Sequence, residues 1–150
     1  MNKVYAMILS HNCGHLLEKA YKKIPLYEFD KIFITDDGSV DNSIEIANSL
    51  GVEVITSNKS GYGANVKNGL RWGFADGADY IVEIHGDGAQ FNPNAIIPAK
   101  KFIDQNFDFI IGSRFINVEK TLELGIPKPR YYANILLSKI DKWILQLPFT

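Results

Sequence analysis

The chain has 150 residues, the length of one ordinary domain and too short for two. Hydrophobic residues make up 46% and charged residues 22%, which is typical of a folded globular protein and excludes a disordered tail. The formal net charge of −1 gives no overall positive field, so we expect no nucleic-acid partner. Cys13 is the single cysteine, which excludes an internal disulfide, and no apolar run approaches the roughly 18 residues of a membrane span. These features predict a soluble, cytoplasmic protein.

Short apolar runs alternate with longer amphipathic segments along the chain. Five apolar runs are predicted strands, at residues 4–9, 31–35, 52–56, 80–84 and 107–111. Helices are predicted at residues 16–24, 44–50, 64–75, from 92 onward and at 131–147, with a loop at 113–129. Asn42 with Glu45 predicts a capping box, and Gly51 predicts a glycine at a helix end. Strands alternating with helices predict an α/β fold, with a mostly parallel sheet covered on both faces.

The segments that follow the strands form the candidate site, because ligands of open parallel sheets bind at the carboxyl ends of the strands. These segments are residues 10–13, 36–41, 57–63, 85–90 and 112–114. They contain four acids, namely Asp36, Asp37, Asp41 and Asp87. Carboxylates near one another repel unless a cation or a polar ligand joins them. The spacing therefore predicts a polar ligand, a cation or both at this edge.

The segment 36–41 has two interpretations. Its aspartates can accept hydrogen bonds from a nucleobase or from ribose hydroxyls, or Ser39 or Asp41 can simply cap the following helix. Two adjacent aspartates and a third exceed what capping needs, so we interpret Asp36 or Asp37 as ligand-binding.

The segment 85–90 predicts a Mg²⁺ or Mn²⁺ site. Asp87 offers a carboxylate and Gln90 a neutral oxygen, whereas an Asx-turn in a glycine-rich loop is the structural alternative. Its place opposite the Asp36–Asp37 pair favours the metal. Zinc at His11, Cys13 and His15 is not favoured, because a second pair of ligands is missing.

Gly61 and Gly63 open a predicted helix, and glycine-rich turns at helix N-termini favour anionic groups. A nicotinamide dinucleotide is not favoured, because Val66 replaces the third glycine and the turn follows the third strand. Arg114 can pair with a diphosphate or with an internal acid, and the sequence leaves both open. The apolar face of the last helix can pack in a core or lie on a membrane surface.

In their order, these motifs resemble glycosyltransferase family 2, in the branch similar to dolichyl-phosphate mannose synthase. Residues 34–43 resemble V-V-D-D-G-S-x-D-x-S, and residues 58–69 resemble N-x-G-x-G-x-A followed by glycine. Residues 85–93 resemble the D-x-D segment, residues 112–115 match G-S-R-F, and residues 127–134 resemble P-x-x-R-x-x-x-N. The resemblance spans residues 4–149 and implies a GT-A fold, a Rossmann-like domain for nucleotide sugars.

The resemblance implies an enzyme that binds a UDP- or GDP-linked sugar and transfers the sugar, with inversion, to a lipid phosphate or a glycan. The donor-binding residues that it implies are Ser10, Asn12, Asp36, Asp37, Gly61, Gly63, Arg114 and Arg130. Mg²⁺ or Mn²⁺ on the diphosphate is expected to be held by Asp87, Gln90 and His85.

The chain also departs from the family pattern. Residues 9–13 lack the proline and glutamate of P-A-Y-N-E, and His85 stands at the first D of D-x-D. The chain ends at Thr150, before the acidic motif expected to carry the general base. We therefore expect residues 1–150 to be a single donor-binding domain that is incomplete at its C-terminal end. An exposed face on the last helix is expected to pair two copies or to meet the cytoplasmic face of a membrane.

Two alternatives remain. The chain can be a non-catalytic nucleotide-sugar-binding module of the same fold, which His85 and the missing acidic motif favour. A sugar-phosphate nucleotidyltransferase is ranked lower, because residues 10–15 contain no arginine for the usual signature of that class.

Overall fold

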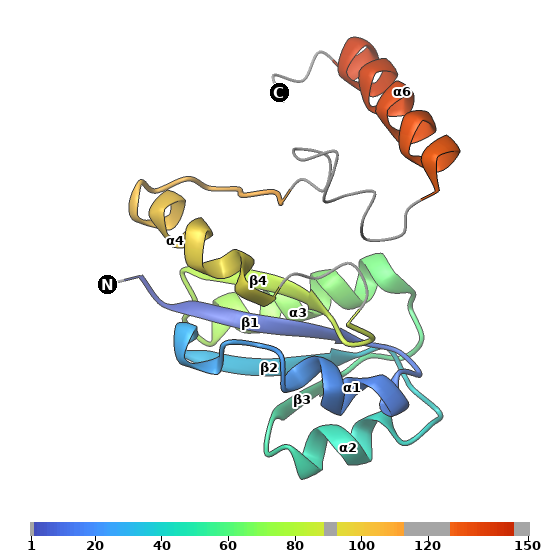
Figure 1. Ribbon diagram of the computed structural model, residues 1–150. Helices are drawn as coiled ribbons and strands as arrows, with labels where there is room; N and C mark the ends of the chain where they lie inside the picture. The colour runs from blue at the N-terminus through green and yellow to red at the C-terminus, as the bar shows by residue number, and fades with distance from the viewer. Residues whose placement is uncertain (1, 89–92, 113–126, 146–150) are drawn as a thin grey trace. The chain divides into compact units, whose positions relative to one another are not determined.

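The computed structural model describes residues 2–88, 93–112 and 127–145 (Figure 1). The chain divides into two compact units, Met1–Ile110 and Ile111–Thr150, which are considered separately. The strands of the first unit are β1 (Val4–Ser10), β2 (Lys31–Asp36), β3 (Glu53–Thr56) and β4 (Tyr80–His85). Its α-helices are α1 (Gly14–Tyr21), α2 (Ser43–Ser49), α3 (Tyr62–Ala75) and α4 (Ile96–Asp104), with short 3₁₀ turns at Leu26–Glu28 and Pro93–Ala95.

The four strands form one parallel sheet in the order β3-β2-β1-β4. This arrangement confirms the predicted α/β fold. The register aligns the strand ends: Ser10 of β1 pairs with Asp36 of β2, and Leu9 pairs with His85 of β4. The loops after these three strands therefore leave the sheet at the same edge.

The core lies on both faces of β1, whose seven residues are all buried. Ala6 and Ile8 belong to a cluster that includes Leu17 of α1 and Ala47 of α2. Tyr5, Met7 and Leu9, which point to the other face, belong to a second cluster that α3 covers. Figure 1 shows the same layers, with α1 and α2 on one side of the sheet and α3 on the other. Successive side chains of a strand point to opposite faces, so a strand buried on both faces is a continuous apolar run.

Helix α3 lies close to the sheet because two glycines face it. A Cβ atom at Gly69 would lie 2.4 Å from the sulfur of Met7, and one at Gly73 would lie 2.7 Å from Ile81 Cδ1. Both distances are shorter than side-chain contacts allow, so glycine lets the helix backbone approach β1 and β4. This close packing fixes the start of α3 beside the strand ends.

The capping box predicted at Asn42 and Glu45 is wrong. Capping of α2 by Asp41, which was one of the interpretations of segment 36–41, is confirmed. Asn42 makes no side-chain cap hydrogen bond. Instead, Asp41 Oδ1 accepts the N–H of Ser43 at 3.0 Å, and Asp41 Oδ2 accepts the N–H of Gly14 at 3.0 Å. One carboxylate thus caps the first residues of both α2 and α1, and ties the two helices together. The helix-end glycine is confirmed, since Gly51 has a φ of +68°.

The predicted fifth strand is also wrong. Residues 107–111 form no strand, and the described residues contain the four strands given above. The N–H of Phe107 donates to Phe102 O at 3.1 Å, so this segment begins by closing the end of α4. Ile110 packs near Val4 and Ile96, whereas Phe109 is 76% exposed. An apolar run becomes a strand only where a partner strand completes its hydrogen bonds, and these residues have none within the described sheet.

The second unit contains α6 (Lys128–Leu145), which extends the predicted 131–147 helix at its start. Its large apolar side chains are mostly exposed, among them Tyr132, Leu136, Leu137, Ile140, Trp143 and Ile144. Among the residues described, no helix has both the length and the apolar character needed to cross a membrane.

Candidate functional site

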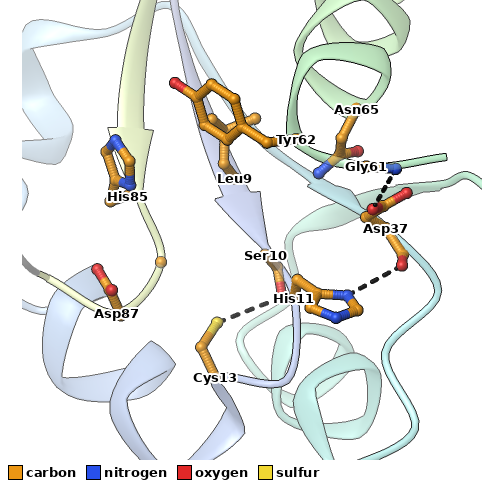
Figure 2. A pocket seen from close by; sticks show the side chains of 11 residues that line it. Leu9, Ser10, His11, Cys13, Asp37, Gly61, Tyr62, Asn65, His85 and Asp87 are labelled. Atoms are coloured by element: carbon orange, nitrogen blue, oxygen red, sulfur yellow. Dashed lines mark hydrogen bonds between the residues drawn. The ribbon is translucent and has the colours of Figure 1, made fainter. Parts of the chain in front are cut away.

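A pocket of about 340 Å³ opens where β1, β2 and β4 end (Figure 2). Asp37, which directly follows β2, and Asp87, which follows β4, both line it. The two acids therefore face one cavity, as the spacing of the strands predicted. The lining residues are Leu9, Ser10, His11, Cys13, Asp37, Gly61, Tyr62, Asn65, His85, Gly86 and Asp87.

Asp37 is buried and held by three donors. Its Oδ1 accepts the Ser60 N–H at 2.8 Å and the Ser57 hydroxyl at 3.0 Å, and its Oδ2 accepts the Gly61 N–H at 2.9 Å. Burial acts to raise the pKa of Asp37, but these hydrogen bonds together lower it below its ordinary value. Asp37 is thus a fixed negative charge that connects the end of β2 to the start of α3.

Asp36 lies outside the pocket lining. It is 1% exposed, and its two oxygens accept the N–H and the hydroxyl of Ser39 at 2.7 and 2.5 Å. The preceding residue, Thr35, bonds to Asn65 of α3, so Asp36 points to the opposite face of β2. The carboxylate of Asp36 shapes the turn, and Asp37 is the acid that reaches the pocket.

The first loop places Ser10, His11 and Cys13 in the pocket wall, while Asn12 serves as a link between loops. Asn12 has a φ of +49°, and its side chain accepts the N–H of Val40 at 2.9 Å. His11 Nδ1 lies 3.0 Å from the carbonyl oxygen of Asp37 and donates to it, because a carbonyl only accepts. His11 Nε2 therefore accepts from the Asn12 amide at 3.2 Å, so one ring nitrogen joins the two loops and the other contacts the neighbouring residue of its own loop.

The end of β4 brings His85, Gly86 and Asp87 to the pocket. The N–H of Gly86 donates to Leu9 O at 2.8 Å, and a Cβ atom on Gly86 would lie 2.7 Å from that oxygen. Glycine is therefore needed for β4 to turn beside β1. Both His85 and Asp87 are exposed at the pocket, and Figure 2 shows them on the side opposite Asp37.

The residues here fit a cation that arrives together with a diphosphate. Among the described residues, no three histidine, cysteine, aspartate or glutamate side chains are arranged to hold a metal ion. Asp87 nevertheless offers an exposed carboxylate at the pocket. Mg²⁺ bound with nucleotides uses one or two carboxylates and takes its other ligands from phosphates and water. The described side chains suit a metal ion that is shared with a diphosphate, and they do not suit a preformed metal site made of protein ligands alone.

The two predicted glycines at the start of α3 differ. Gly61 lines the pocket, has a φ of +85° and donates its N–H to Asp37. Its φ lies in the region that favours glycine. Gly63 lies within α3 and outside the pocket lining, with open space where a Cβ atom would stand.

Sequence reasoning missed Tyr62 and Asn65 as pocket residues. Asn65 is buried and fastens α3 to β2, because its amide donates to Thr35 O at 3.0 Å and its Oδ1 accepts the Thr35 hydroxyl at 2.6 Å. A polar residue on the buried face of a helix was the signal that could have indicated it. Three of the predicted residues cannot be placed: Gln90 and Arg114 lie outside the described residues, and the side chain of Arg130 is not described.

The profile described as "Glycosyl transferase family 2" matches residues 5–147 of the chain. The chain therefore belongs to glycosyl transferase family 2, a family of enzymes. The resemblance stated from the motifs is confirmed by this match.

A curated relative is UDP-N-acetylglucosamine–dolichyl-phosphate N-acetylglucosaminyltransferase of Methanococcus voltae, 22% identical over 154 residues. The alignment covers 91% of this chain and 57% of the relative, so the chain spans little more than half of that protein.

Solved structures share the fold. Glucosyl-3-phosphoglycerate synthase of Mycobacterium tuberculosis, in complex with Mn²⁺, UDP and glucosyl-3-phosphoglycerate, matches with a TM-score of 0.57 and 19% identity. The match covers 78% of this chain and 47% of that chain. Mannosyl-3-phosphoglycerate synthase of Rubrobacter xylanophilus matches with a TM-score of 0.53 and 23% identity, over 62% of this chain and 33% of that chain. At these identities the likeness shows a common GT-A fold.

Proposed function

We propose that the pocket binds a nucleoside-diphosphate sugar together with Mg²⁺ or Mn²⁺, as the donor site of an inverting glycosyltransferase. The single observation that carries this proposal is that Asp37 and Asp87 line one cavity of about 340 Å³ at the ends of parallel strands. That cavity is of the size that holds a small ligand. Its two acids stand at opposite sides, which suits a ligand with a neutral nucleoside at one end and a diphosphate at the other.

We assign the nucleoside to the Asp37 side. Asp37 keeps its charge because backbone and hydroxyl donors hold it, so its carboxylate can accept a hydrogen bond from a base imide or a ribose hydroxyl. His11 and Ser10 form the adjoining floor of the pocket. The loop geometry is fixed before the ligand arrives, which reduces the entropy lost on binding.

We assign the diphosphate to the Asp87 side. A carboxylate facing a diphosphate repels it unless a cation lies between them. A divalent cation there would offset the charge of both groups and stabilise the departing nucleoside diphosphate. Asp87 and His85 are the described side chains that would hold it, and Gln90 is the third residue of this proposal.

The sugar acceptor is proposed to be a lipid phosphate. The support is the Methanococcus voltae relative, whose name states transfer to dolichyl phosphate. The choice of UDP and Mn²⁺ as first probes has similar support, since both are named for the Mycobacterium tuberculosis complex.

Calorimetric titration of the 150-residue chain tests the proposal. We expect UDP or GDP to bind in the presence of Mn²⁺, and we expect EDTA to weaken that binding. Absence of binding by both nucleotides, with and without Mn²⁺, would contradict the donor site. If the chain binds the nucleotide but neither transfers the sugar to dolichyl phosphate nor hydrolyses the donor, the non-catalytic module is favoured over the enzyme.

A further inference from the structure

Tyr62, Glu83 and His85 form a side-chain cluster across the end of β1. The Tyr62 hydroxyl donates to Glu83 Oε1 at 2.5 Å, and the same oxygen lies 3.8 Å from His85 Nε2. The rings of Tyr62 and His85 are stacked, with centroids 6.0 Å apart and planes at 19°. The cluster therefore connects the first residue of α3 to the last residues of β4.

Glu83 has no evident role in the core. It lies on the same face of β4 as Ile81, which packs under α3, but it stands nearer to the pocket. The hydrogen bond to Glu83 raises the pKa of Tyr62, with burial adding to the shift, so the hydroxyl stays protonated and keeps donating. Glu83 and His85 together restrict where the Tyr62 ring can lie.

The ring of Tyr62 is exposed even though it is held. Tyr62 is 59% exposed and lines the pocket, and Figure 2 shows its ring in front of Leu9, between His85 and Gly61. An exposed aromatic ring that polar partners fix in place is available to another flat ring. The residue before it, Gly61, bonds to Asp37, so the Tyr62 ring lies between the side where we assign the nucleoside and His85.

We propose that Tyr62 is a specificity-determining residue that stacks on the base of the bound nucleotide, with Glu83 as a positioning residue. This inference rests on the proposed function, because it needs a nucleotide in the pocket. Stacking of a base on an aromatic side chain tolerates different bases, since every base has a π-face. Tyr62 thus distinguishes nucleotides from other phosphates, whereas hydrogen bonds at Asp37 distinguish among bases.

The test compares Mn²⁺-dependent ligands with and without a nucleoside. Dissociation constants of UDP, GDP and inorganic pyrophosphate are measured for the wild-type chain and for Tyr62→Ala. We expect Tyr62→Ala to weaken the nucleotide that binds by about fivefold or more and to change pyrophosphate binding by less than about twofold. Tyr27→Ala is the matched control, because Tyr27 is 81% exposed and lies outside the pocket lining.

Two further variants test whether Glu83 positions Tyr62. Tyr62→Phe keeps the ring and loses the hydroxyl, and Glu83→Ala removes its acceptor. Each is expected to weaken nucleotide binding less than Tyr62→Ala does, and the double variant is expected to match the single ones, because both remove one hydrogen bond.

Each result decides between the inference and its alternatives. An equal loss of UDP and pyrophosphate binding in Tyr62→Ala would mean general damage to the pocket and would overturn the inference. Unchanged nucleotide binding in Tyr62→Ala would overturn it while leaving the proposed function intact. A wild-type chain that binds neither UDP nor GDP would overturn both.

Discussion

The carboxylate of Asp37 and the backbone N–H of Gly61 are joined at 2.9 Å, which ties the end of β2 to the first turn of α3. The contact places a fixed negative charge beside the glycine turn, at the pocket that Asp87 enters from β4. Fold and site therefore depend on the same hydrogen bonds around Asp37.

Replacing Asp37 is expected to lower both stability and nucleotide binding. Asp37→Ala leaves the N–H groups of Ser60 and Gly61 without their acceptor, and the loss of a hydrogen bond to a charged group costs about 1.5–3 kcal/mol. Urea unfolding at pH 7 measures the free energy of unfolding, and Asp104→Ala at the end of α4 is the exposed control. A stability equal to that of the wild type would show that these hydrogen bonds are not needed.

Replacing Asp41 is expected to destabilise more than replacing the residues of the predicted capping box. Asp41 caps α1 and α2, and the loss of one cap costs about 0.5–2 kcal/mol, so Asp41→Ala is expected to exceed Asn42→Ala and Glu45→Ala. The melting temperatures of the three variants rank their losses of stability. A larger loss in Asn42→Ala would restore the capping box.

Acid is expected to destabilise the fold through Asp37 and Asp41. The pKa of Asp41 is lowered by its hydrogen bond from the Ser43 hydroxyl, against a smaller opposing effect of burial. The unfolded chain therefore binds these protons more readily than the folded chain does. Stability from both groups is present above about pH 5 and is lost as pH falls through 4 and below. Urea unfolding at several pH values measures how the free energy of unfolding changes with pH. Asp41→Asn is expected to reduce this change, and an unreduced change would contradict a lowered pKa for Asp41.

Gly86→Ala is expected to destabilise, whereas Gly63→Ala is not. An added Cβ at Gly86 meets the backbone oxygen of Leu9 at 2.7 Å, and overpacking of this kind costs about 1–3 kcal/mol. A Cβ at Gly63 meets no atom within 4 Å, and alanine is the better helix former. Thermal unfolding of the pair separates the two cases, and equal melting temperatures would argue against the close turn at Gly86.

Removing the Asp87 carboxylate is expected to affect metal-dependent binding and not folding. Asp87 is exposed at the pocket, so Asp87→Asn is expected to unfold like the wild type. It should lose the part of nucleotide binding that depends on Mn²⁺, because the amide carries no charge. Titrations with and without EDTA measure that part. If EDTA has no effect on either protein, Asp87 does not act through a metal.

The edge of the sheet that carries the site could be predicted from the sequence. Continuous apolar runs alternating with helices indicate parallel strands, and parallel strands release their loops at one edge. For this reason Asp37 and Asp87 were predicted to lie near one another although 50 residues separate their numbers.

Finer features depend on side-chain direction and on partners distant in sequence. Asp36 and Asp37 are neighbours, and only the register of β2 decides which one enters the pocket. The Tyr62–Glu83 contact joins two elements whose packing the pattern does not specify. The 107–111 run has strand composition, but composition does not supply a partner strand.

Paramagnetic broadening of backbone amide signals by Mn²⁺ tests the central claim most directly, because the broadening reports distance from the ion. With UDP or GDP present, we expect Mn²⁺ to broaden first the signals of Gly86, Asp87 and the other residues lining the pocket, and to do so weakly without the nucleotide. Equal broadening with and without nucleotide, or broadening centred on residues away from the pocket such as Asp79 and Asp108, would contradict a shared metal–diphosphate site between Asp87 and Asp37.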